Sequence, residues 1–124
     1  MNKIVVNVRV HGVHRWIDCN IDEVSYLRDY HRHMFHIKCV KPVIHGDRDI
    51  EIIMFKKNVK DYLREEYFDM NRDVCFFDGM SCEMIAKELA EQFDLTECEV
   101  LEDGENGAIY TQKVDLAPKI DWSI

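Results

Sequence analysis

The spacing of apolar residues changes along this chain from that of strands to that of helices, and this change limits the fold classes open to it. Between Ile4 and Val10 every second residue is apolar, which is the period of a strand with one buried face. Residues 34–44 are rich in β-branched and aromatic side chains, and after a turn signal at Gly46-Asp47 residues 49–55 are apolar again. This pattern predicts a first strand followed by a long hairpin.

The second half of the chain opens with helical spacing. Phe55, Val59 and Leu63 lie four residues apart, and residues 85–93 repeat the same period. The hydroxyl of Ser81 is suited to cap the second of these helices. Two amphipathic helices are therefore expected, separated by an irregular connection.

Two further strands are predicted after the helices, over 97–101 and 108–113, joined by a turn at 104–107. The expected core is ββααββ, a four-stranded antiparallel sheet with two helices on one face. We expect one α+β domain over residues 1–124, since no Gly/Ser-rich or Pro-rich stretch suggests a linker.

Three histidines are placed for metal binding. Residues two apart on a strand share a face, so His31 and His33 project together while Arg32 points away. His14, near the end of the preceding strand, supplies a third imidazole, and zinc is commonly bound by three such ligands. His11 is an alternative third ligand, because Gly12 breaks the strand pattern and the sequence leaves open on which face of the strand His11 lies. The alternative is that His14, His31 and His33 are ordinary polar groups at strand ends.

Charge and cysteine content limit the partners and the compartment. The net charge of −8 argues against nucleic acid as the main partner, and favours small molecules or proteins. No apolar run reaches the roughly 20 residues of a membrane helix, and the chain enters its first strand without a charged leader, so a cytoplasmic protein is expected. Five cysteines without a C-x-x-C pair indicate reduced, mostly buried thiols.

An acidic cluster precedes the first helix. Asp47, Asp49 and Glu51 are either solvated strand positions or the lining of a pocket, and in the second case Glu51 would contact a ligand. Arg32, between the paired histidines, carries a cation that can meet a phosphate or an acidic neighbour.

Four short motifs occur in an order that resembles one family. They are His14-Arg15, His31-Arg32-His33-Met34-Phe35, the segment Ser81 to Ala86, and Val100-Leu101-Glu102 with the following Ala108-Ile109-Tyr110. Over roughly Val8 to Gln112 the chain resembles the tunnelling-fold family of 6-pyruvoyl tetrahydropterin synthase and 6-carboxytetrahydropterin synthase. The resemblance implies Zn²⁺ on His14, His31 and His33, a pterin ring held by Glu102, and a homo-oligomeric barrel, a hexamer.

The chain departs from that family at the residues that move protons. No cysteine occurs at 25–28, Cys19 lies too far upstream to be assumed a substitute, and no histidine follows His45, so the position near Asp69 lacks its partner. General acid–base groups contribute about 10²–10⁴-fold in typical enzymes. No catalytic residue is assigned.

These departures favour a zinc-containing protein that binds a purine-like, pterin-like or nucleotide-derived small molecule without the usual synthase turnover. The alternative is an active metal-dependent lyase of the pterin or 7-deazaguanine (queuosine precursor) pathway that acts on dihydroneopterin triphosphate. In that case zinc would polarise a substrate oxygen.

Overall fold

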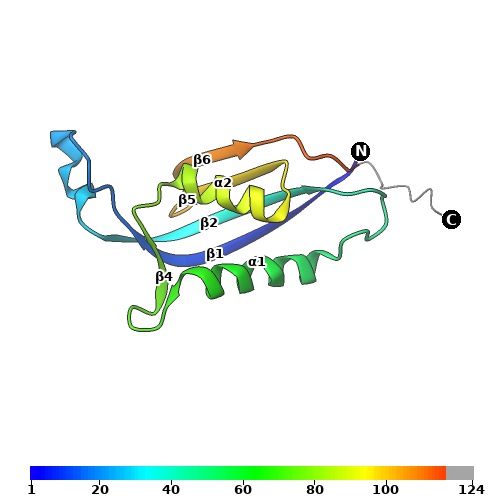
Figure 1. Ribbon diagram of the computed structural model, residues 1–124, viewed down its shortest axis with the longest axis horizontal. Helices are drawn as coiled ribbons and strands as arrows, with labels where there is room; N and C mark the ends of the chain where they lie inside the picture. The colour runs from blue at the N-terminus through cyan, green and yellow to red at the C-terminus, as the bar shows by residue number, and fades with distance from the viewer. Residues whose placement is uncertain (117–124) are drawn as a thin grey trace, which may run out of the picture.

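The computed structural model describes residues 1–116 and consists of one mixed sheet with two α-helices packed on it (Figure 1). A short 3₁₀ helix, η1, lies in the connection that protrudes from one end of the sheet. The elements in chain order are β1 (Lys3–His14), η1 (Asp22–Arg28), β2 (His31–Pro42), α1 (Ile52–Tyr67), β3 (Phe68–Asp69), β4 (Val74–Asp78), α2 (Cys82–Phe93), β5 (Glu97–Glu102) and β6 (Asn106–Thr111).

The strand order is β3-β4-β1-β2-β5-β6, and all neighbours are antiparallel except β1 and β4. The α+β class is confirmed, but the expected four-stranded antiparallel sheet is wrong, because the sheet has six strands and one parallel pair. The extra strands lie in the connection that was expected to be irregular. β4 is a short apolar run in which Val74, Cys75 and Phe77 are buried and Phe76 is half-buried, so it has no alternating pattern to reveal it.

The long hairpin is formed by different segments than expected. β1 and β2 pair along their whole length, from Lys3 opposite Pro42 to His14 opposite His31. Residues 49–55 do not form a return strand, because α1 begins at Ile52. The carboxylate of Glu51 caps this helix by accepting hydrogen bonds from the backbone N–H groups of Ile53 and Met54.

Both α-helices cover the same face of the sheet. Alternate residues of β1, including Val6 and Val8, enter one apolar core with Val59 of α1 and Leu89 of α2. The rings of Phe55 in α1 and Phe93 in α2 meet edge to face within this core. The expected helices are therefore present, and Ser81 caps α2 by accepting a hydrogen bond from the backbone N–H of Met84.

Gly12 allows β1 to continue past the core toward the histidines. A Cβ atom at this position would lie 2.6 Å from a ring carbon of Phe77 and 2.7 Å from one of Phe35. Only glycine lets these two rings approach the strand so closely. Because the alternation continues through Gly12, His14 lies on the core face and His11 on the exposed one.

Candidate metal centre

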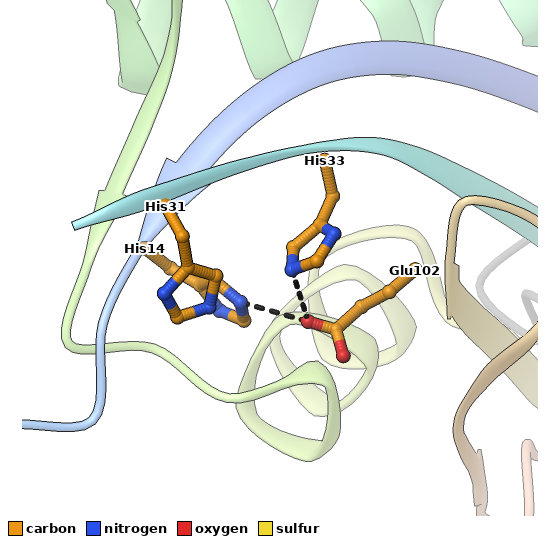
Figure 2. A group of neighbouring side chains, drawn as sticks. All are labelled: His14, His31, His33 and Glu102. Atoms are coloured by element: carbon orange, nitrogen blue, oxygen red, sulfur yellow. Dashed lines mark hydrogen bonds and ion pairs between the residues drawn. The ribbon is translucent and has the colours of Figure 1, made fainter. Parts of the chain in front are cut away.

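Four side chains that can bind a metal meet where β1 ends and β2 begins (Figure 2). His14 lies directly opposite His31, and His33 follows two residues later on the same face of β2. Glu102, the last residue of β5, lies opposite Phe35 on the next strand of the sheet. One potential ligand atom from each of the four residues lies within 4.8 Å of the others.

Glu102 is in direct contact with two of the imidazoles. Its Oε2 atom lies 2.9 Å from Nε2 of His14 and 3.0 Å from Nε2 of His33, the two contacts drawn in Figure 2. His14 is 8% exposed and is the only buried polar residue among residues 1–116. The sequence predicted the histidines as metal ligands and Glu102 as a ring anchor, and the structure brings all four together.

The second nitrogen of each imidazole faces a hydrogen-bond acceptor. Nδ1 of His14 lies 2.9 Å from the carbonyl oxygen of Met80, and Nδ1 of His31 lies 2.9 Å from that of Asp29. Nδ1 of His33 lies 2.8 Å from Oδ2 of Asp103. These oxygens only accept, so each Nδ1 carries the hydrogen and donates it. In a neutral ring this arrangement leaves the Nε2 lone pair free for a metal, as outer partners of metal-binding histidines usually do.

The contacts to Glu102 indicate positive charge at the centre of the cluster. Nε2 of His14 and Oε2 of Glu102 are 2.9 Å apart, and two lone pairs at that distance repel each other. Because Nδ1 of His14 already holds one hydrogen, either a second proton or a metal ion must lie between the ring and the carboxylate. The donor set of three imidazoles and a carboxylate fits zinc.

Asp103 connects the cluster to the backbone of β2. Besides accepting from His33, its carboxylate accepts a hydrogen bond from the backbone N–H of Met34 at 3.0 Å. The hydrogen bond from His33 and then that from Met34 lower the pKa of Asp103 below the ordinary carboxyl value. Sequence reasoning treated Asp103 only as a neighbour of Glu102, and its position at the start of the β5–β6 turn was the one available signal.

A cavity of about 600 Å³ opens beside the cluster. His14, His31 and Glu102 form part of its wall, and Trp16 and Met80 are among its apolar lining residues. This volume lies within the range of about 300–1,000 Å³ typical of small-molecule sites. The cavity is therefore large enough for a small molecule next to the candidate metal position.

Cys82 also lines this cavity, a role that sequence reasoning missed. Burial, followed by the nearby charges of Glu102 and Glu83, raises the pKa of the Cys82 thiol to about 12, so the thiol stays protonated at neutral pH. Cys19, the other thiol considered, is buried and faces the carbonyl oxygens of Ile21 and Val24 in its own loop. All five cysteines are free and buried, as expected.

Two residues predicted to bind ligand lie elsewhere. Arg32 is exposed on the opposite face of β2 from His31 and His33. Glu51 is the cap of α1, and that helix begins at the end of the sheet where β2 finishes, whereas the histidines lie where β2 starts (Figure 1). The structure therefore does not bring Arg32 or Glu51 to the cluster.

Comparison with known proteins found no family model and no curated protein that matches this sequence. Within the described part of the chain, no helix is long and apolar enough to cross a bilayer.

Proposed function

We propose that this protein binds a zinc ion through His14, His31 and His33 and holds a purine-like, pterin-like or nucleotide-derived small molecule in the adjoining cavity. The observation that carries the proposal is the convergence of three imidazoles whose Nδ1 atoms are all committed to fixed acceptors. Such preset orientation is characteristic of metal-binding histidines. When bound, zinc supplies a Lewis acid that polarises a ligand oxygen.

Glu102 is placed to serve the ion, the ligand or both. Its Oε2 atom faces the imidazoles, and Oε1 makes no hydrogen bond within the described residues. Because Glu102 also lines the cavity, Oε1 is the atom we assign to the N–H groups of a guanine-like ring edge. This is the role that the resemblance to the tetrahydropterin synthases implies.

The residues around the cavity favour binding over the usual synthase turnover. Cys82 is held as the neutral thiol, and Cys19 faces its own loop, so neither presents a thiolate to a ligand. Asp69, where the family has its acid–base partner, instead accepts hydrogen bonds from the backbone of Asn71 and Arg72 in a turn. Cys19 and Asp69 are therefore held by contacts within their own loops, and Cys82 remains a thiol.

The second candidate function is an active lyase on dihydroneopterin triphosphate. One observation favours it, namely that a metal on the three histidines would border an open cavity, as catalytic zinc does. A turnover assay separates the two functions. Binding without turnover is expected, and a rate near the median enzyme value of about 10 s⁻¹ would establish the lyase instead.

Elemental analysis of protein purified without a metal-affinity tag tests the metal site. Near-stoichiometric zinc is expected in the wild type, with a large loss in His31→Ala and His33→Ala. His11→Ala is the matched control, because His11 is an exposed histidine on the other face of β1. Equal zinc in all four proteins would exclude the site.

Mass spectrometry of small molecules released from the purified protein tests the second half of the proposal. A purine-like or pterin-like compound is expected in the wild type, and its amount should fall in Glu102→Ala. An unrelated compound that persists in this variant would contradict the assignment of the cavity.

A further inference from the structure

A second hollow of about 540 Å³ lies over the exposed face of the sheet. Two cross-strand rows supply its floor: Asn7, Lys38 and Glu99 are paired in one row, and Arg9, His36 and Leu101 in the next. These side chains alternate with the core residues of the same strands, so they point away from the apolar core.

Helix α1 completes the rim. β4 pairs with β1 only over Gly12 to His14, so nearer its start β1 has no strand on that side. α1 runs along this part of β1 in Figure 1. Lys56 and Lys60, one helical turn apart, border the hollow from there.

The charge around this hollow is strongly positive. Arg9, Lys38, Lys56 and Lys60 face it together with His36, against the single carboxylate of Glu99. Among residues 1–116 no ion pair joins any of these four cations to an acid, whereas elsewhere Lys57 pairs with Asp61 and Arg72 with Asp69. Cations gathered around one hollow repel one another unless an anion lies between them.

We propose that this hollow binds the phosphate groups of a small-molecule diphosphate or triphosphate. A guanidinium and several ammonium groups suit a chain of phosphates, the first as a forked donor and the others as point charges. The volume matches a small molecule. A long nucleic acid is disfavoured, because the protein carries a net charge of −8 outside this limited patch.

The residues that line this hollow are separate from the four residues of the candidate metal centre. His36 and Lys38 alternate with the face of β2 that carries His31 and His33. Failure of the zinc proposal would therefore not contradict the phosphate proposal, and failure of the phosphate proposal would not contradict the zinc proposal.

Calorimetry with inorganic triphosphate and with a nucleoside triphosphate, at about 0.15 M salt, tests the proposal. One ligand per chain is expected, with affinity lowered about tenfold or more in Arg9→Gln and in Lys38→Gln. Arg32→Gln is the matched control, since Arg32 is an exposed cation on the same face of β2 but does not border the hollow. Tighter binding of the nucleoside form would show that its base also makes contacts.

Two further measurements keep the result specific. Binding should persist in His33→Ala, which excludes chelation of a metal by the phosphates, and Lys60→Gln on the surface of α1 should weaken it without disturbing the sheet. No binding at this salt concentration, or equal weakening in the Arg32→Gln control, would overturn the proposal. So would tighter binding of a single-stranded oligonucleotide than of triphosphate.

Discussion

Asp103 shows how one residue outside the candidate metal ligands can fix the position of one of them. Its backbone φ of 56° is left-handed, a conformation that Asp and Asn tolerate better than other side chains. This conformation is accompanied by a hydrogen bond from its own backbone N–H to the carbonyl of Met34, while its carboxylate holds His33. The orientation of the His33 ring thus depends on a turn residue.

Replacing Asp103 with Asn should lower zinc affinity by about 10- to 100-fold, as is typical for outer partners of metal ligands. The amide keeps the left-handed backbone but has only one oxygen, which cannot accept from both His33 and the N–H of Met34. Chelator competition measures the change. Asp73→Asn is the control, because Asp73 also has a left-handed φ, of 55°, in the β3–β4 turn.

The same substitution carries a pH signature in metal-free protein. Because the folded-state pKa of Asp103 is depressed, its contribution to stability is present above the ordinary carboxyl pKa and is lost as pH falls through the lowered value. The difference in unfolding free energy between wild type and Asp103→Asn should therefore be larger above the ordinary carboxyl pKa than in acid below it. A difference that grows toward acid pH would contradict this.

Glu102 is expected to decide which ring binds. A carboxylate accepts two N–H bonds from a guanine-like or pterin edge, and adenine lacks that pair of donors. Glu102→Gln exchanges an acceptor for a donor and should cost on the order of 1–3 kcal/mol, or about 5- to 150-fold in affinity. Calorimetry with pterins, guanine nucleotides and adenine nucleotides measures this, and tighter binding of adenine ligands by wild type would remove the ring-anchor role.

Residue by residue, the sequence identified the four clustered side chains but not what orients them. His31 and His33 could be predicted from the sequence because residues two apart on one strand share a face, and His14 because it ends the preceding strand. The acceptors on Met80 and Asp103 come from distant segments, and a backbone carbonyl has no sequence signature. The approach of Glu102 to His14 spans 88 positions and depends on the sheet order.

At the scale of elements, β1 depends on Gly12, although glycine in a sequence pattern normally argues against a strand. Gly12→Ala should destabilise the fold by about 1–3 kcal/mol, because the new methyl group would overlap the rings of Phe35 and Phe77. Urea denaturation measures the loss. Gly79→Ala is the control, since a Cβ atom there meets nothing within 4 Å, and equal destabilisation by both would show that the rings of Phe35 and Phe77 are not the cause.

Glu51 provides a test that distinguishes a helix cap from a ligand contact. Glu51→Ala removes the acceptor for the backbone N–H groups of Ile53 and Met54 and should cost about 1 kcal/mol of stability. Zinc content and ligand affinity should remain at wild-type values. Unchanged stability with weakened ligand binding would restore the role predicted for Glu51 from sequence.

The elements that sequence predicted well are those with a regular period and a local cap. β1, α1 and α2 have alternating or helical apolar spacing, and Ser81 caps α2 as expected. β4 was missed because its apolar run has no period. The return strand over 49–55 was predicted wrongly, because the exposed apolar residues Ile52, Ile53 and Met54 occupy the first turn of α1.

The sheet of the whole molecule has strand edges with which no described strand of the same copy pairs. β6 pairs only with β5, and along Lys3 to His11 β1 pairs only with β2 among the described strands. Unpaired N–H and C=O groups on such edges favour pairing with another chain, and ring closure of several sheets removes them. We propose a homo-oligomeric barrel, and the family resemblance implies a hexamer.

Light scattering coupled to size exclusion should therefore show an oligomer at micromolar concentration. Ile109→Lys places a charge on β6, where Ile109 is 55% exposed, and should shift the population toward smaller species because charged side chains disfavour edge pairing. Met70→Lys is the control, since Met70 is 86% exposed in the turn between β3 and β4. A monomeric wild type would contradict the barrel, and dissociation by both variants would indicate that added charge, rather than the β6 edge, separates the subunits.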